Sequence, residues 1–90
     1  MKIKFSKSSK EDLYNIQKYI CGDNKTSAKE VISYIILRVE MLLENPAIGK
    51  PGRVLGTREL VISKCPYIVP YQVRDDVIYI LRVLHTSRKW

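Results

Sequence analysis

Cysteine and histidine are scarce in this chain of 90 residues, which holds two cysteines, Cys21 and Cys65, and one histidine, His85. Two widely separated cysteines cannot form the disulfide framework of a small secreted domain. A structural zinc site needs about four cysteine or histidine ligands at short spacing, and no Cys-x-x-Cys pair or Cys/His cluster is present. We therefore expect free thiols, no metal ion and no cofactor.

Long apolar runs are also missing. No segment reaches the roughly 18 consecutive apolar residues of a membrane-spanning helix. The N-terminus lacks the apolar region of about 7–15 residues that marks a secretory signal. The sequence therefore predicts a cytoplasmic protein in a reducing compartment, without a membrane partner.

Glycine is rare as well, yet three of the four glycines lie within Gly49–Gly56. Their spacing matches neither the Gly-x-Gly-x-x-Gly of dinucleotide-binding folds nor the phosphate-binding P-loop. A His-Glu-x-x-His zinc motif is absent too, because the chain has a single histidine. These nucleotide-binding and zinc-peptidase motifs are thus absent, and the Gly/Pro stretch is read as the boundary between a helical half and a β-rich half.

The charge balance is strongly basic. Residues 1–90 form one domain by length, with a formal net charge of +7. Residues 50–90 hold eight Lys or Arg against three Asp or Glu, whereas residues 1–49 hold eight against six. The β-rich half is therefore the electropositive half, which favours nucleic acid, the ribosome or an acidic protein as partner.

The first half of the chain reads as a short strand and two helices. Lys2–Phe5 alternates polar and apolar residues as a half-buried strand does. Ser8 with Glu11 three residues later has the pattern of a capping box at a helix start. A second helix is expected to start near Thr26 or Ser27 and to end before Pro46. Its apolar positions recur at helical spacing and predict a wide buried stripe: Ala28, Val31, Ile32, Ile35, Ile36, Val39, Leu42 and Leu43.

The second half has the period of two that is typical of strands. Strands are expected over 58–63, 67–73 and 77–84. The last is apolar on both faces apart from Tyr79 and Arg82, so it is predicted to be the central strand. Pro70 has no N–H to donate to a sheet, which predicts a bulge or one-sided pairing at that point.

Turn lengths predict which strand residues pair. A two-residue turn at Asp75-Asp76 places Tyr71 opposite Ile80, and a turn at Lys64-Cys65 places Arg58 opposite Tyr71. Because residues alternate faces along a strand, Arg58, Tyr71 and Arg82 are expected on one face. Two interpretations remain open. The arginines form a clamp for phosphate or carboxylate, or they are satisfied by Glu59, Asp75, Asp76, backbone carbonyls or the C-terminal carboxylate.

The residues after the last strand are candidates for function. His85 follows that strand directly and is a candidate general acid or base, a stacking group or a structural residue. Arg88-Lys89-Trp90 joins cations to an aromatic side chain, which suits nucleic-acid contact or pinning of the tail to the core.

Taken in order, these segments resemble the RelE/ParE superfamily of toxins from bacterial type II toxin–antitoxin modules. The resemblance rests on the segments 45–49, 51–54, 56–61, 66–73 and 80–85 with Arg88. It implies an α+β fold with the order β-α-α-β-β-β, in which an N-terminal helical hairpin packs on a small curved antiparallel sheet. It also implies neutralisation by a cognate antitoxin that wraps the toxin in a hetero-oligomer.

The superfamily divides by target, and the resemblance is closer to ParE-like members, which poison DNA gyrase. RelE-like members cleave messenger RNA on the ribosome. Where they carry two lysines and an arginine, this chain has Glu59, Val61 and Ile68, which cannot stabilise developing phosphate charge. The Leu84-His85 ending also looks ParE-like.

Three hypotheses about function follow from the resemblance. The first is a gyrase inhibitor without bond-making chemistry, whose target-binding surface is formed by Arg58, Arg82, His85, Arg88, Lys89 and Trp90. The second is a ribosome-dependent endoribonuclease, with His85 as acid or base and Arg58 and Arg82 as catalytic partners. The third is a non-toxic relic that only binds its antitoxin.

Overall fold

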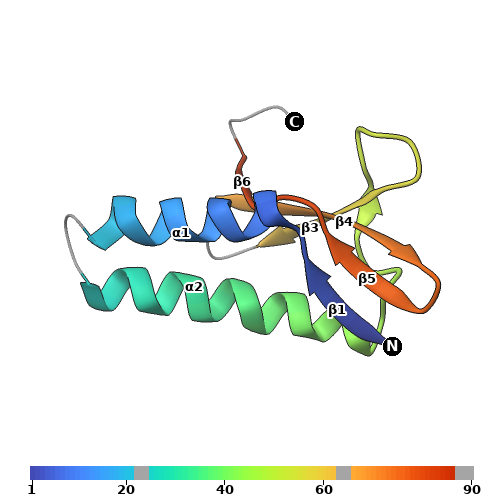
Figure 1. The fold of residues 1–90 in the computed structure, drawn as a ribbon, viewed down its shortest axis with the longest axis horizontal. Coiled ribbons are helices and arrows are strands. Elements are labelled where there is room, and N and C mark those ends of the chain that lie inside the picture. The colour runs from blue at the N-terminus through green and yellow to red at the C-terminus, as the bar shows by residue number, and fades with distance from the viewer. Residues whose placement is uncertain (22–24, 63–65, 87–90) are drawn as a thin grey trace.

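A computed structural model describes residues 1–21, 25–62 and 66–86. Strand β1 (Lys2–Phe5) leads into two helices that lie side by side and run in opposite directions (Figure 1). The helices are α1 (Lys7–Cys21) and α2 (Lys25–Glu40), and α2 continues into a short 3₁₀ turn, η1 (Met41–Leu43). The predicted strand and helical hairpin are therefore confirmed, and α2 with η1 ends before Pro46 as predicted. The helix starts at Lys25, close to the predicted start, but Thr26 and Ser27 lie inside it, so neither is its N-cap.

Helix α1 begins earlier than the predicted capping box at Ser8 and Glu11. The capping residue is Ser6, whose Oγ accepts the N–H of Ser9 at 3.0 Å. The Ser9 hydroxyl donates to the Ser6 carbonyl at 2.8 Å, and Ser9 is fully buried. The Ser6 N–H also donates to Ile80 O at 3.0 Å. The sheet thus fixes Ser6 at the strand–helix junction, and this tertiary contact overrides the local signal at Ser8.

The sheet has the strand order β1-β5-β4-β3-β2, and β6 pairs with β4. Its remaining strands are β2 (Lys50–Pro51), β3 (Arg58–Ile62), β4 (Tyr67–Arg74), β5 (Val77–Ile80) and β6 (Leu84–His85). The prediction of a purely antiparallel sheet is corrected at one pair, because β1 runs parallel to β5. Tight turns make neighbouring strands antiparallel, but β1 and β5 are joined through the helical hairpin and most of the sheet, so no turn sets their direction.

The predicted strand over 77–84 is broken, and β4, not this segment, is the central strand. Tyr71 pairs with Ile80 and Ile68 pairs with Leu84, so three residues of the 81–83 segment face two residues of β4. The extra residue is a β-bulge opposite Pro70, as expected where a proline cannot donate to the sheet. Pro70 still accepts the N–H of Leu81 at 2.9 Å. Of the two alternatives predicted at Pro70, a bulge or one-sided pairing, the structure shows the bulge.

The predicted hairpin registers are confirmed as far as Ile80, beyond which the bulge shifts the pairing by one residue. Tyr71 lies opposite Ile80, and Arg58 lies opposite Tyr71. Asp75 and Asp76 both have positive φ, 51° and 63°, as a two-residue type I′ hairpin turn requires. The predicted turn at Lys64-Cys65 lies outside the described residues.

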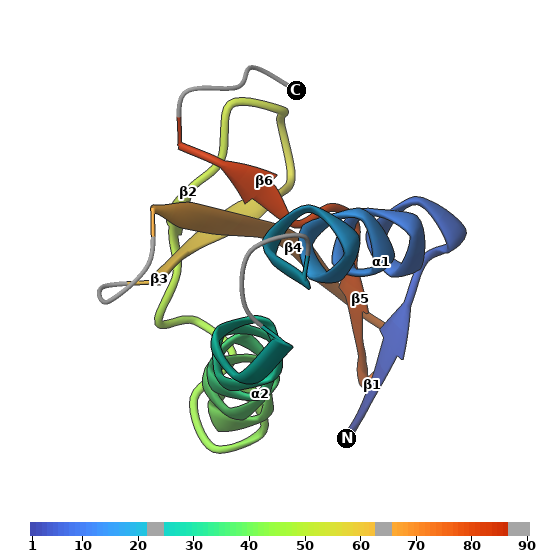
Figure 2. The same cartoon turned by 90° about the vertical axis from the view of Figure 1, so that its left-hand side faces the viewer.

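The core lies between the helices and the sheet, which curves around α2 (Figure 2). The apolar residues of α2 recur at the helical period of about 3.6, and those of the strands recur at the period of two. Both sets therefore lie on the inner face of their element, where they pack together. The buried cluster holds Ile16, Ile35, Val39, Leu42, Leu60, Ile62, Val69, Tyr71, Ile78, Ile80 and Val83. The α+β prediction is thereby confirmed, and the residues of β3, β4 and the bulge that carry candidate functional groups rest on this core.

Candidate functional site

Arg58 and Tyr71, paired across β3 and β4, hold the segment that leads from the helices into the sheet. Arg58 Nη1 donates to the carbonyl of Gly49 at 2.8 Å and to that of Ala47 at 3.3 Å. The Tyr71 hydroxyl donates to Pro46 O at 2.7 Å and accepts the N–H of Gly49 at 2.9 Å. Four hydrogen bonds thus fix residues 46–49 against the sheet.

This clamp works only because Gly49 has no side chain. A Cβ at Gly49 would come within 2.5 Å of the Tyr71 hydroxyl oxygen. Tyr71 itself is fully buried, and this burial raises the pKa of its hydroxyl above the ordinary value of 10.0. The Gly49 hydrogen bond and the Arg58 charge oppose the shift in part. The Tyr71 hydroxyl is therefore neutral at physiological pH and acts as a hydrogen-bond donor and acceptor, not as an acid or base.

Arg82 is tied to helix α1 by Asp12. Its Nε and Nη2 donate to the two carboxylate oxygens of Asp12 at 2.7 and 3.0 Å. The N–H of Val83 donates to the same carboxylate at 2.9 Å. This bidentate pair raises the pKa of Arg82 above its usual value, chiefly through the Asp12 hydrogen bond. The Asp12 carboxylate therefore accepts hydrogen bonds both from the Arg82 guanidinium and from the Val83 N–H in the bulge.

His85 lies on β6 and is exposed. Its ring meets that of Tyr67 edge-on, with centroids 5.7 Å apart and an interplanar angle of 81°. Tyr67 pairs directly with His85 across β4 and β6, so the ring contact follows from the strand register. The other predicted target-binding residues, Arg88, Lys89 and Trp90, lie outside the described residues.

The predicted cluster of cations is thus distributed over separate segments. Arg58 and Tyr71 are neighbours as expected, but Arg82 is paired with α1, because the bulge at 81–83 shifts the register there by one residue. For Arg58, the interpretation with backbone carbonyls as acceptors agrees with the geometry. For Arg82 the acceptor is Asp12, which was not among the predicted candidates. A role of these residues in target binding stays a prediction.

Sequence reasoning missed Asp12, although a signal was present. Asp12 lies between the buried residues Ser9 and Ile16 at the helical spacing of three and four. A carboxylate on the buried face of a helix needs a partner, since burial of an unpaired charge is costly. That spacing predicts an ion pair from α1, but not that Arg82 supplies it.

Glu59 is a second acidic residue with a structural role. It is 3% exposed, and its Oε2 accepts the N–H of Arg53 at 3.0 Å. It therefore braces the loop of residues 52–57, which joins β2 to β3. The Thr57 hydroxyl donates to Val54 O at 2.6 Å, and the N–H of Gly52 donates to Thr57 O at 2.9 Å. The loop is held from inside, while its apolar residues Val54 and Leu55 are exposed.

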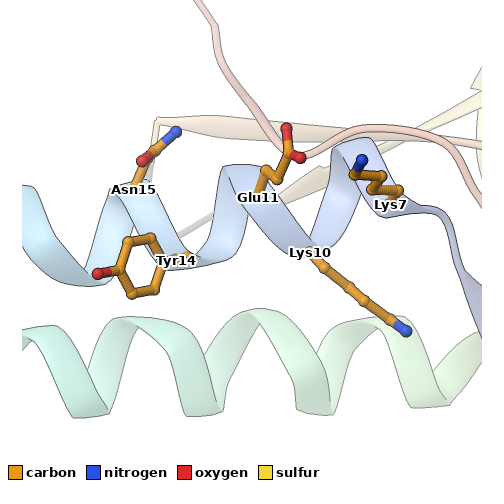
Figure 3. Close-up of a pocket in the computed structure, with 5 residues that line it drawn as sticks. All are labelled: Lys7, Lys10, Glu11, Tyr14 and Asn15. Atoms are coloured by element: carbon orange, nitrogen blue, oxygen red, sulfur yellow. The ribbon is translucent and has the colours of Figure 1, made fainter.

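The outer face of α1 carries an open, shallow hollow (Figure 3). Its lining residues all come from this helix: Lys7, Lys10, Glu11, Tyr14 and Asn15. Side chains of a single exposed helix face do not converge on one point, so the hollow lacks the enclosed, convergent polar groups of a catalytic or cofactor site.

Within the described part of the chain, no three His, Cys, Asp or Glu side chains are placed to hold a metal ion. Across residues 1–21, 25–62 and 66–86, no helix has the length and apolar character needed to cross a membrane.

Comparison with known proteins decides the family. A model of the family described as the ParE toxin of the type II toxin-antitoxin system, parDE, matches residues 3–90. The chain belongs to the ParE toxin family. The predicted resemblance, and its closer fit to ParE-like members, is confirmed.

Two relatives of this ParE-family chain support the assignment. A protein named as a toxin, Y4kP, from Sinorhizobium fredii (strain NBRC 101917 / NGR234), is 44% identical over 78 residues, which cover 87% of this chain and 80% of the relative. A solved structure described as the chromosomal ParDE TA system from P. aeruginosa matches with a TM-score of 0.84. It is 27% identical and covers 94% of this chain and 95% of its own.

Proposed function

We propose that this ParE-family protein inhibits DNA gyrase in the bacterial cytoplasm and so stops growth when it is free of its antitoxin. The observation that carries the proposal is the match to the ParE toxin family over residues 3–90. Inhibition of gyrase is typical of this family. The basic second half of the chain fits a target that works on DNA, because its positive charge favours approach to a polyanionic complex.

The arrangement of cations supports inhibition by binding more than RNA cleavage. A nuclease needs several cations directed at one phosphate, where negative charge develops in the transition state. Here Arg58 donates to carbonyls of the 46–49 segment, and Arg82 donates to Asp12. Glu59, where RelE-like nucleases carry a lysine, is buried and braces a loop. Each of these groups already has a structural partner.

We also propose that a cognate antitoxin neutralises the protein in a hetero-oligomer. The solved relative is described as a ParDE toxin–antitoxin system. Leu37 on α2 and Met41 on η1, which continues α2, lie one turn apart and are exposed at 57% and 44%. Between them Arg38 donates to Val61 O at 3.3 Å, and its Nε is buried without a hydrogen-bond partner in the described structure. An antitoxin segment with apolar anchors would cover this strip.

The test compares DNA topology with messenger-RNA integrity after induced expression. A gyrase inhibitor is expected to leave plasmid DNA relaxed or broken while messages stay intact. Cleaved ribosome-bound messages would instead select the RelE-like endonuclease. A chain without any effect on growth would select the non-toxic relic.

The variant His85→Gln sharpens this test, because glutamine keeps hydrogen-bonding atoms but does not titrate near neutral pH. A nuclease that used His85 as acid or base would lose about 10²–10⁴-fold in cleavage. A gyrase inhibitor needs no proton transfer, so we expect His85→Gln to retain most of its toxicity. Loss of all toxicity in a folded variant, together with message cleavage by the wild type, would contradict the proposal.

A further inference from the structure

The structure points to a target-docking element that the sequence did not reveal. We propose that the 52–57 loop inserts Leu55 into an apolar socket with an acidic rim on the toxin's target protein. This inference rests on the proposed function for the identity of that target, DNA gyrase, but not for the existence of a target.

The first observation is the exposure of the loop tip. Leu55 is 98% exposed, the highest value among the exposed large apolar side chains of the described residues. Val54 beside it is 45% exposed. Single exposed apolar residues are common on protein surfaces and need no explanation by themselves. The exposure of Leu55 therefore indicates a binding role only in combination with the hydrogen bonds that hold the loop.

The second observation is that buried polar groups hold the loop in one shape. The Glu59 carboxylate, which is 3% exposed, accepts the N–H of Arg53 at 3.0 Å. The Thr57 hydroxyl and N–H both donate to Val54 O, at 2.6 and 3.1 Å. A Cβ at Gly52 would collide with the Thr57 hydroxyl, so this approach requires glycine. None of these bonds involves the Leu55 side chain, yet together they fix where it points.

A rigid loop with an exposed anchor is suited to binding. An anchor that is already ordered loses little conformational entropy when it enters a pocket, so more of its burial appears as affinity. Burial of a carboxylate is costly unless the group is well hydrogen-bonded. The hydrogen bond from the Arg53 N–H offsets this cost for Glu59 and at the same time holds the loop in a defined shape.

The charge around the tip indicates the chemistry of the socket. Arg53 is exposed in the loop and Lys50 is exposed on the adjoining strand β2, and residues 45–58 contain no Asp or Glu. The complementary surface is therefore acidic at its rim and apolar at its centre. Nucleic acid fits less well, because Leu55 has no π-face on which a base can stack and Arg58 nearby is occupied by backbone carbonyls.

The position of the loop separates it from the strip of α2 that we assign to the antitoxin. The loop, yellow-green between β2 and β3, projects from the sheet on the side opposite α2, and β6 with His85 lies on that same side (Figures 1 and 2). Target and antitoxin would therefore use different surfaces. A substitution at Leu55 is therefore expected to weaken binding to the target and to leave binding to the antitoxin unchanged.

The experiment compares the wild type with Leu55→Ser, Leu55→Met and, as a matched control on the opposite side, Leu37→Ser. Growth inhibition, inhibition of plasmid supercoiling by purified gyrase, affinity for plasmid DNA, and affinity for the product of the adjacent open reading frame are measured for each. Thermal melts check folding, and Leu55→Ser is expected to melt like the wild type because its side chain packs against nothing in the monomer.

We expect Leu55→Ser to raise the concentration for half-inhibition of gyrase by about tenfold or more, the effect of losing one buried leucine anchor. Leu55→Met keeps the apolar contact and is expected to stay within about threefold of the wild type. Leu37→Ser should inhibit gyrase like the wild type. Antitoxin affinity should be unchanged in both Leu55 variants.

Four results would overturn the inference. These are full toxicity of Leu55→Ser, loss of antitoxin affinity in place of toxicity, loss of affinity for plasmid DNA alone, and a wild type without effect on growth. If the wild type is toxic but leaves gyrase unaffected, the proposed function is wrong. The role of Leu55 is then tested by comparing growth inhibition by the wild type and by Leu55→Ser. Lost toxicity of Leu55→Ser then assigns the tip to a different target protein, and retained toxicity overturns the inference.

Discussion

At the scale of single residues, the buried hydroxyl of Tyr71 connects two parts of the chain that are distant in sequence. It donates to Pro46 O and accepts from Gly49 N–H, although Tyr71 lies in the middle of β4. Both backbone groups would lose their partner if the hydroxyl were removed. A buried polar group left without a partner costs about 1–3 kcal/mol.

We therefore predict that Tyr71→Phe lowers the free energy of unfolding by about 1–3 kcal/mol at pH 7. The effect should depend on pH. Burial raises the pKa of Tyr71 in the folded state above 10.0, so the folded protein holds this proton more tightly than the unfolded chain. The stability that the neutral hydroxyl contributes is present below pH 10 and is lost as the pH rises through the folded pKa.

Denaturant unfolding between pH 7 and pH 11 measures both effects. The stability gap between wild type and Tyr71→Phe should narrow above about pH 10. Tyr14→Phe is the control, because Tyr14 is 63% exposed and its substitution should leave the stability at pH 7 unchanged. A gap of constant size across this pH range would contradict the assignment.

At the scale of secondary-structure elements, helix α1 stabilises the interruption between β5 and β6. The Ser6 hydroxyl donates to Leu81 O at 2.9 Å, and the Asp12 carboxylate accepts from Val83 N–H and Arg82. These contacts satisfy backbone groups that leave the sheet at the bulge. The direction of β6, and with it the position of His85, therefore depends on α1.

We predict that Asp12→Ala lowers the free energy of unfolding by about 2–3 kcal/mol, because it removes a charged hydrogen-bond acceptor and leaves Val83 N–H unpaired. Glu11→Ala, one residue away and exposed, is the matched control and should change stability by less than about 0.5 kcal/mol. Asp12→Asn keeps an acceptor and should fall between the two. Thermal melts rank the three variants. Equal melting of Asp12→Ala and Glu11→Ala would show that the ion pair adds no stability.

At the scale of the whole molecule, a chain of 90 residues leaves apolar surface uncovered. Two such surfaces lie on opposite sides: the α2 strip with Leu37 and Met41, and the loop tip with Leu55. Polar or charged residues would serve solubility better at these positions. We interpret both as surfaces for partners.

Association with the antitoxin should therefore depend on the α2 strip. We predict that the double variant Leu37→Ser/Met41→Ser weakens binding to the product of the adjacent open reading frame by about tenfold or more, because two partly buried anchors are lost. Calorimetric titration measures this affinity, with Leu55→Ser as the control that retains it. If the double variant binds as tightly as the wild type, the antitoxin covers another surface.

Local patterns in the sequence determined the elements and much of their pairing. The period of two predicted the strands, the stripe of α2 predicted the buried helix face, and Pro70 predicted the bulge. The registers of Arg58 with Tyr71 and of Tyr71 with Ile80 followed from turn lengths, since a hairpin turn sets the pairing of the strands it joins. The family resemblance was also readable from residues alone, because its segments recur in order along the chain.

The tertiary structure alone decided what the functional groups contact. The parallel pairing of β1 with β5 joins strands that no turn connects, and the pairing of Asp12 with Arg82 joins residues 70 positions apart. Such contacts depend on how the helical hairpin packs on the sheet, which no local pattern encodes. The same holds for the loop tip, where only the packed fold shows that Glu59 is buried and braces the loop that exposes Leu55.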